Sequence, residues 1–172
     1  MRLLLAAAST LLFLVSPAFC VADFSGKWVL DLRASSSPHA ILKRLGASWV
    51  ERQFGGSIQM EATYTQTPQL LTVDHRGFGF QKTDVIRIDN KPEIQQDSLL
   101  GRYTIRTFWS ENGMQLISVI SFHTKDSRDT QLTIVRELAD GGKTLIWRST
   151  LKIAGESGSQ TLRRVWRKRE SA

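Results

Sequence analysis

The sequence is poor in the residues that fix a fold or a reaction through sulfur or metal chemistry. Among 172 residues it has one cysteine and three histidines. The cysteine, Cys20, lies in an N-terminal segment that we expect to be removed, so the mature chain would have neither a disulfide nor a thiol. The histidines His39, His75 and His123 are far apart in sequence, and we expect each to be exposed, in a turn or at a strand end. The sequence therefore predicts no zinc site and no other cofactor.

The sequence also lacks the short motifs of common catalytic sites. It contains no Gly-x-Ser-x-Gly, no phosphate-binding glycine loop and no His-Glu-x-x-His. The three serines at positions 35–37 have no base near them in the sequence. We therefore expect a protein that is not an enzyme.

Long apolar runs are absent except at the N-terminus. Residues 1–22 begin with Arg2, continue with the apolar stretch Leu3–Val15 and end on the small residue Ala22. This three-part pattern is typical of a secretory signal peptide. The apolar stretch is shorter than the about 20 residues that cross a bilayer as a helix, which argues against a retained anchor.

Cleavage after Ala22 would leave residues 23–172 as one domain of a secreted or periplasmic protein. Cys20 raises the alternative of a lipoprotein, but Phe19 occupies the position where a lipidation signal has a small residue. A mature chain of about 150 residues buries roughly two-thirds of the surface that it exposes when unfolded, so it needs no disulfide.

Positive charge is in excess, since 23 lysines and arginines face 16 aspartates and glutamates. Nucleic acid, an anionic envelope surface and an acidic small ligand are all compatible with this balance. The one dense basic run is Arg163–Arg169, and we expect all of its charges except that of Arg164 to be solvated. We expect no nucleic-acid partner, because the five tryptophans lie on five different predicted elements and export removes most nucleic acid.

The first elements of the predicted domain are a strand and a helical segment. Residues Phe24–Leu32 alternate apolar and polar with period two, as in a half-buried strand. Ser35–Ser37 then offer helix N-caps, and Pro38 suits a first helical turn. Apolar residues follow at helical spacing, namely Ile41, Leu42, Leu45, Trp49 and Phe54. We expect Gly46 to divide this segment into two short helices.

The remainder of the chain reads as strands joined by turns. The predicted strands are Ile58–Thr65, Leu70–His75, Thr83–Ile88, Arg102–Trp109, Met114–Phe122, Gln131–Leu138, Thr144–Ile153 and Thr161–Lys168, with Glu93–Gln96 as a short extra one. Turns are expected between them, the second at Arg76-Gly77. The fold class is therefore all-β, an up-and-down antiparallel barrel of about ten strands with a two-helix lid. Such a barrel is wider than the eight-stranded size that side chains can fill, so its interior should hold water or a ligand.

Four segments resemble the fatty-acid-binding proteins, a lipocalin-related family of the calycin superfamily. They are the Gly-x-Trp of Phe24–Trp28, the helical Leu42–Trp49 followed by Arg52, the strand Thr133–Leu138 before Asp140-Gly141, and the last strand Leu162–Trp166. The resemblance implies that two arginines and a tyrosine hold a fatty-acid carboxylate inside the barrel. The arginines fall on Arg136 and Arg164, and the tyrosine position holds Trp166. An indole N–H donates a hydrogen bond but cannot accept one, so the head-group geometry should differ.

Strand periodicity supports the inward direction of both arginines. Leu162, Arg164 and Trp166 share one face of their strand, and Arg136 shares a face with Leu132, Ile134 and Leu138. A guanidinium on an apolar face inside a barrel is costly unless an anion or water satisfies it. The alternative is that Arg136 points outward or pairs with an acid such as Glu61 or Asp84. Trp28 is expected to be a structural plug, and Trp147 to point inward like Trp166.

These patterns predict non-covalent binding and transport of a hydrophobic anionic small molecule, a fatty acid or similar lipid, with Arg136, Arg164 and Trp166 as ligand contacts. We expect a monomer. Lys43, Arg44 and Arg52 on the lid suit transient contact with an anionic membrane, although an ordinary solvated helix face explains them equally well. The alternative from another class is a non-catalytic envelope module whose barrel is filled and whose basic surface binds a protein or a polysaccharide.

Overall fold

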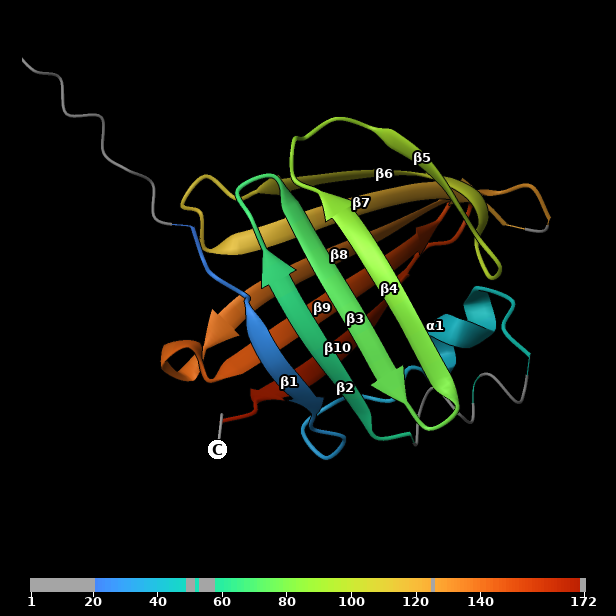
Figure 1. The fold of residues 1–172 in the computed structure, drawn as a ribbon. Helices are drawn as coiled ribbons and strands as arrows, with labels where there is room; N and C mark the ends of the chain where they lie inside the picture. Colours follow the sequence, from blue (N-terminus) through green and yellow to red (C-terminus); the bar gives the residue numbers. More distant parts are fainter. Residues whose placement is uncertain (1–20, 49–51, 53–57, 125, 171–172) are drawn as a thin grey trace, which may run out of the picture.

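A computed structural model of the chain describes residues 21–48, 52, 58–124 and 126–170. Its elements are β1 (Gly26–Leu30), α1 (His39–Arg44), β2 (Met60–Gln66), β3 (Leu70–Gly77), β4 (Phe80–Arg87), β5 (Glu93–Asp97), β6 (Gly101–Trp109), β7 (Gln115–His123), β8 (Asp129–Ala139), a 3-10 turn (Asp140–Gly142), β9 (Thr144–Ile153) and β10 (Ser159–Lys168). The strands form one curled sheet, and α1 covers one end of it (Figure 1). The predicted all-β, up-and-down fold is confirmed.

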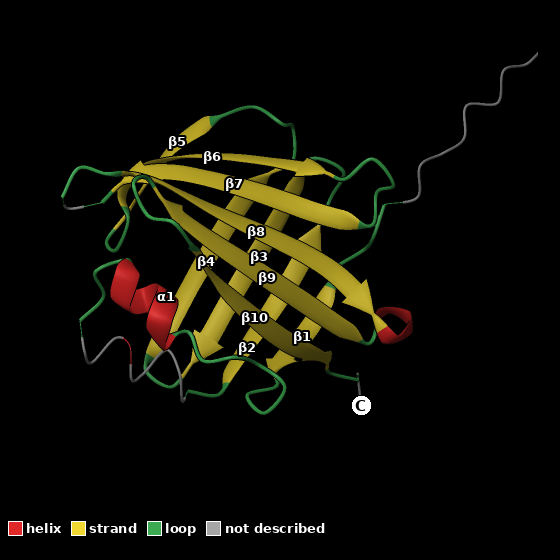
Figure 2. Ribbon diagram, turned by 180° about the vertical axis from the view of Figure 1, so that it is seen from behind, coloured by secondary structure: helices red, strands yellow, loops and turns green. Residues whose placement is uncertain are grey.

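The sheet runs in the order β4-β3-β2-β1-β10-β9-β8-β7-β6-β5, and every neighbouring pair is antiparallel. The pairing of Leu30 with Trp166 brings the first and last strands together. The two halves of the sheet cross one another when the molecule is seen from behind (Figure 2).

One seam of the barrel is not closed by a backbone ladder. The end strands β4 and β5, both wholly described, are not neighbours in the sheet. Side chains bridge them instead: Lys82 Nζ lies 3.3 Å from Asp97 Oδ2, and Arg87 Nε lies 3.8 Å from Glu93 Oε2. Edge strands that carry such charges are protected against pairing with other chains.

Alternation along the strands produces two apolar clusters inside the barrel. The first fills the end where β1 begins and contains Phe24, Trp28, Leu71, Leu116 and Trp166. Trp28 is fully buried, and its Nε1 donates a hydrogen bond to the Phe24 carbonyl oxygen at 2.9 Å, as expected for a structural plug. The second cluster lies beneath α1 and consists of Ile41, Ile120, Phe122, Leu132, Leu151 and Ile153.

The helical segment departs from expectation in its cap. Pro38 occupies the N-cap of α1 and has no side chain that can cap it, although Ser37 Oγ accepts from the N–H of His39 at 3.3 Å. Ser35 Oγ instead accepts from the N–H of Val165 at 2.9 Å, so that serine fastens the incoming loop to β10. Gly46, with a φ of +82°, ends the helix as predicted. Within the described residues one helix of the expected pair is present, and the second, which would contain Trp49, lies largely outside them.

The second turn is also displaced from its predicted position. Arg76 and Gly77 belong to β3, where Gly77 pairs with both Met60 and Phe80. The chain reverses at Phe78-Gly79, where Gly79 has a φ of +67° that a glycine adopts without strain. The longer β3 changes the environment of His75, which lies inside the strand rather than at its end.

Candidate ligand-binding site

A layer of polar side chains separates the two apolar clusters. Each of the strands β6 to β10 contributes a buried polar residue at an inward position, namely Thr107, Ser118, Arg136, Ser149 and Arg164, and β8 also buries Thr130, which pairs with Ile153 of the second cluster. The next inward positions before and after these five residues along each strand are apolar and belong to the two clusters. The interior is therefore apolar at both ends and polar in the middle.

Arg136 lies at the centre of this layer and is only 4% exposed. Its Nη1 donates to Ser118 Oγ at 3.1 Å, and the Ser118 oxygen also receives the Thr107 hydroxyl at 2.9 Å. The guanidinium carbon lies 4.8 Å from the centre of the Trp147 ring, in a cation–π contact. Burial lowers the pKa of Arg136, which the nearby Tyr64 and Asp84 partly offset.

No carboxylate forms an ion pair with Arg136 among the described residues. Glu61 pairs with Arg169 at 2.9 Å, and Asp84 pairs with Lys82 at 3.1 Å. The alternative interpretation, in which Arg136 points outward or pairs with one of these acids, is therefore wrong. Arg136 is a buried cation that donates to the Ser118 hydroxyl, lies against the Trp147 ring and has the Tyr64 hydroxyl close by.

Five buried polar atoms near Arg136 make no hydrogen bond of standard geometry with any residue that the structure describes. They are Tyr64 Oη, His75 Nδ1, Arg136 Nε, Trp147 Nε1 and Trp166 Nε1. We call these five residues the polar cup. The rings of Trp147 and Trp166 lie 5.6 Å apart, and His75 contacts both. Buried polar atoms are normally paired, so five unpaired ones in one group are a marked exception.

Tyr64 is the hydroxyl member of the cup. Burial raises its pKa well above the ordinary range of tyrosine, although the charge of Arg136 and the Trp147 indole act in the opposite direction. The phenol therefore remains protonated at any ordinary pH and serves as an O–H donor.

Arg164 points inward, as predicted, and is 8% exposed. Its side chain has no hydrogen bond or ion pair with any described residue, and burial lowers its pKa. The strand register places Trp147 between Arg136 and Arg164 in one row across three strands. The two arginine backbones are thus about 10 Å apart, twice the spacing of neighbouring strands. The structure brings Arg136 and Trp166 into the cup and places Arg164 beside it.

His75 contradicts the expectation that it is exposed, since only 7% of the residue is accessible. Because β3 continues through Gly77, His75 shares the inward face with Leu71 and Val73. Its Nε2 lies 3.5 Å from Asp84 Oδ2. Burial acts to raise the pKa of Asp84, but the hydrogen bond from His75 and the charge of Lys82 outweigh it, and the net pKa is lowered.

The sequence analysis missed Tyr64 and His75 as site residues, as well as the hydroxyls of Thr107 and Ser118. The signal that could have found them is the same period-two alternation that placed Arg136 and Arg164. Tyr64 alternates with Ala62 on β2, and both are buried. Applying that alternation to every strand would have identified the whole polar layer.

A cleft of about 1080 Å³ is lined by outward residues of the sheet and also by Phe122 and Ile153, which belong to the second apolar cluster. One register row across it is formed by outward positions of six strands, Ile94, Thr104, Ser121, Gln131, Lys152 and Ser159. Its charged side chains are exposed, and His123 there pairs with Asp129 at 2.9 Å. The unsatisfied polar groups lie inside the barrel, not in this cleft.

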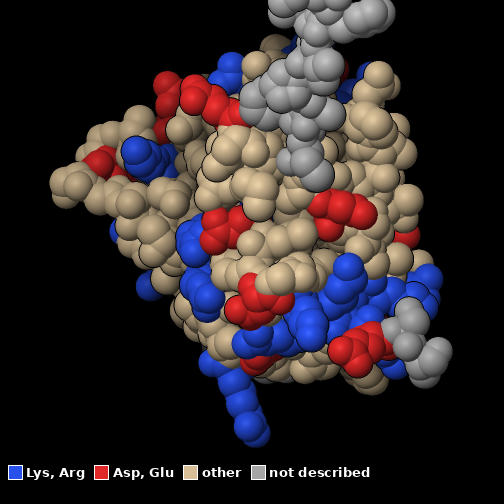
Figure 3. Space-filling view, turned by 90° about the vertical axis from the view of Figure 1, so that its left-hand side faces the viewer, with Lys and Arg blue, Asp and Glu red and all other residues tan. Residues whose placement is uncertain are grey.

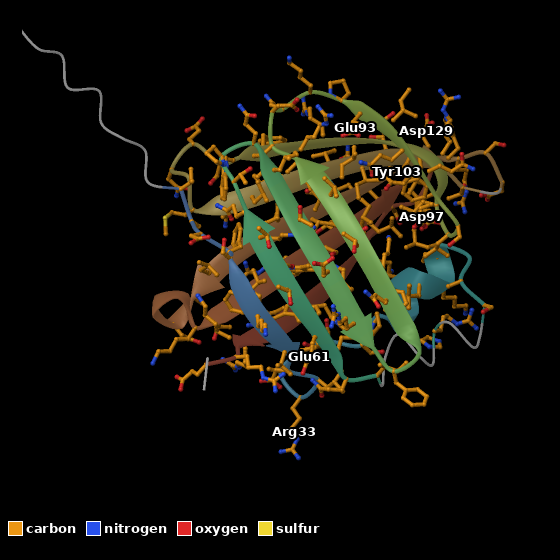
Figure 4. All side chains as sticks on the ribbon, viewed as in Figure 1. Arg33, Glu61, Glu93, Asp97, Tyr103 and Asp129 are labelled. Atoms are coloured by element: carbon orange, nitrogen blue, oxygen red, sulfur yellow. The ribbon has the colours of Figure 1, made fainter. Side chains whose placement is uncertain are left out.

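The described residues contain no group of three or more histidine, cysteine, aspartate or glutamate side chains placed to hold a metal ion. In the same residues, no helix has the length and apolar character needed to cross a membrane. Figure 4 shows Asp97 and Tyr103 close to the seam between the end strands and Arg33 pointing away from the barrel.

No known family model matches the sequence, and no match was found among curated proteins. Solved structures do match the fold. A fatty acid binding protein of Schistosoma mansoni, in complex with arachidonic acid, is 20% identical with a TM-score of 0.63, over 86% of this chain and 96% of that one. Lipid binding protein 8 of Caenorhabditis elegans is 15% identical with a TM-score of 0.66, over 91% and 100%.

A fatty acid-binding protein from brain tissue of Drosophila melanogaster is 23% identical, with a TM-score of 0.61 over 84% of this chain and 99% of that one. At these identities the likeness establishes the fold. The class is the up-and-down barrel of the fatty-acid-binding proteins, as the sequence resemblance indicated. Within that class this chain has a buried arginine surrounded by two tryptophans, a tyrosine and a histidine.

Proposed function

We propose that this protein binds and carries a fatty acid or a similar hydrophobic anion without chemical change, with the acidic head in the polar cup. The observation that carries the proposal is the set of buried, unpartnered polar atoms around Arg136, a cation without a counter-ion among the described residues. An anion entering the cup would satisfy the atoms and neutralise the charge together.

The number of donors suits a carboxylate. An ionised carboxylate accepts about four hydrogen bonds on its two oxygens. Four buried donors, Arg136 Nε, Trp147 Nε1, Trp166 Nε1 and Tyr64 Oη, make no hydrogen bond of standard geometry within the described part of the chain. Arg164, on the same row and also without a partner, adds positive charge beside them. Trp166 thus donates from the position where the resembling family has a tyrosine.

The apolar tail of the ligand has a matching environment. The second cluster adjoins the polar layer on the side of α1, and each methylene buried against it contributes about 0.8 kcal/mol. A tail lying there would replace contacts that Ile41 of α1 makes with the interior. Entry of the ligand therefore requires α1 to shift, which makes the helix a lid.

The lid end has features that suit delivery to a membrane. Lys43 is exposed on α1, whereas Arg44 is held by Glu156 at 2.8 Å. Phe78 is 88% exposed and belongs to the turn between β3 and β4, a turn that lies at the same end of the barrel as α1 (Figures 1 and 2). An exposed aromatic beside positive charge fits the interface of an anionic bilayer. Export through residues 1–22 would place this activity in the periplasm or outside the cell.

The alternative of a surface-binding module has weaker support. Figure 3 shows Lys and Arg side chains gathered on the side of the molecule where the chain ends, with Asp and Glu among them. Much of the C-terminal basic run is neutralised, since Arg167 pairs with Asp31 at 3.1 Å and Arg169 pairs with Glu61. A filled barrel would also leave the five unpaired atoms of the cup unexplained.

Titration calorimetry with decanoate and 1-decanol tests the proposal. Decanoate should bind more tightly than the alcohol, because only the anion neutralises Arg136 and accepts from all four donors. Mass spectrometry of lipid extracted from the purified protein would identify the natural ligand. Equal affinities for the acid and the alcohol, or no binding of either, would contradict the proposal.

A further inference from the structure

The polar cup contains one group that the proposed function leaves unused, the imidazole of His75. Its ring lies edge-on to Trp147, with centroids 5.8 Å apart and an interplanar angle of 87°. A second contact, of 6.2 Å, joins it to Trp166. The imidazole therefore forms part of the same wall as the two indoles that we assign to the head group.

The other side of the imidazole faces β4. His75 Nε2 lies 3.5 Å from Asp84 Oδ2, so the carboxylate favours a proton on Nε2. In a neutral imidazole, a proton on Nε2 leaves Nδ1 as an acceptor. His75 Nδ1 is buried and has no partner. Neutral His75 thus presents an unused acceptor to a cup whose four other members are donors.

We infer that His75 senses the charge of the head group by taking up a proton when an acid anion enters the polar cup. This inference rests on the proposed function. A carboxylate oxygen beside an unprotonated Nδ1 would bring two acceptors together. Protonation of Nδ1 replaces that repulsion with a charge-assisted hydrogen bond, so the proton passes from solvent to the imidazole and no bond of the ligand changes. Histidine is the side chain whose charge ordinarily changes between about pH 5 and 8.

The surrounding charges explain why the proton would arrive with the ligand and not before it. The charged and titratable groups on the elements packed around His75 are Asp84 and Lys82 on β4, Tyr64 on β2, Arg136 on β8 and Arg164 on β10. Asp84 favours a charged imidazole, but it is already paired with Lys82, and the two arginines oppose a further positive charge. An anion in the cup cancels this opposition, because it neutralises the arginines and adds an acceptor.

A ligand with an uncharged head group should behave differently from an acid. An alcohol head group brings its own O–H, which can donate to unprotonated Nδ1 without any proton uptake. His75 would thus let the cup accept an acid with a proton from solvent and an alcohol without one. The binding of an acid should then be accompanied by uptake of a proton from solvent, whereas the binding of an alcohol should not.

Calorimetry in buffers of different ionisation enthalpy tests the inference at pH 7. For decanoate the measured binding enthalpy should vary linearly with the ionisation enthalpy of the buffer. The slope gives the number of protons taken up per ligand and should lie between zero and one. For 1-decanol the slope should be zero. His75→Phe keeps an aromatic ring against the tryptophans and should abolish the slope while decanoate still binds. His123→Phe removes an exposed histidine that pairs with Asp129, and should keep the wild-type slope.

Nitrogen-15 NMR of labelled histidine gives a second measurement that needs no variant, because the full sequence has only three histidines. Addition of decanoate should move one imidazole from the neutral form with Nε2 protonated to the doubly protonated form. Decanoate binding with a buffer-independent enthalpy and three unchanged imidazoles would overturn the inference and leave the proposed function standing. Absence of decanoate binding would overturn the proposed function itself.

Discussion

Arg136→Met tests the polar cup at its centre. Methionine matches the aliphatic part of arginine and packs well against aromatic rings, so it fills much of the space beside Trp147 while it removes the charge and every N–H donor. A hydrogen bond to a charged group contributes about 1.5–3 kcal/mol. The affinity for decanoate should therefore fall by roughly ten- to a hundredfold, at 1.4 kcal/mol per factor of ten.

The same substitution should not weaken the fold. No acid among the described residues neutralises Arg136, so its removal leaves no carboxylate without a partner. Ser118 keeps its hydrogen bond with Thr107 when the guanidinium is gone. Because an unpaired buried charge is unfavourable, the free energy of unfolding without ligand should stay the same or rise. Weaker binding together with equal or greater stability distinguishes a ligand contact from a residue that only holds the structure together.

Calorimetry and urea unfolding on three proteins would measure both effects. The matched control is Arg148→Met on β9, because Arg148 is half-exposed, points outward and pairs with Glu137. The control should keep the wild-type affinity for decanoate. An unchanged affinity in Arg136→Met, or a loss of unfolding free energy of about 3 kcal/mol or more, would refute the assignment of Arg136, since the latter is the cost of breaking a buried ion pair.

Three further predictions concern other parts of the chain. N-terminal sequencing of exported protein should begin at Asp23, and a protein that retains residue 1 would contradict the signal peptide. Lys43→Glu and Phe78→Ser should each slow the transfer of a fluorescent fatty acid to anionic vesicles and leave its equilibrium affinity unchanged. Transfer rates that respond neither to these substitutions nor to salt would mean that α1 only covers the barrel and has no role in delivery to membranes. The pKa values of Asp84 and Asp97 are lowered in the fold because His75, Lys82 and backbone N–H groups outweigh burial, so their contribution to stability is present above about pH 4 and is lost as the pH falls through the folded values. Urea unfolding from pH 7 to 2 should show that loss, and it should be smaller in Asp97→Asn.

The fold could be predicted because most strands have one face in water and one in the core. The predicted boundaries of β9, Thr144–Ile153, are those of the structure, and Leu162, Arg164 and Trp166 face inward as their spacing indicated. The open seam could not be predicted in this way. Whether the two end strands meet depends on how far the whole sheet curls. That curl is the sum of small twists over ten strands, so the sequence of either end strand alone does not determine it.

The errors at His75 and at the helix cap have a common cause. Gly77 was taken as a turn residue and Ser35–Ser37 as N-caps because each type is common in those roles. In the structure Gly77 is part of β3 because it pairs with Met60 of β2, and the hydroxyl of Ser35 accepts a hydrogen bond from β10. Local preference was outweighed in both places by a partner far away in the sequence. The proximity of Tyr64, His75 and Trp147 depends on the same long-range packing.

The seam between β4 and β5 has a consequence for association between molecules. A fully closed barrel has no free strand edge, but this one keeps two, and Val85 and Ile94 expose apolar side chains there. Free apolar edges are templates for intermolecular β-pairing and amyloid growth. The ion pairs of Lys82 with Asp97 and of Arg87 with Glu93 therefore connect the two edges and also hinder their pairing with strands of other molecules. Neutralising those four side chains should leave the ladder intact and make the protein aggregate through its seam.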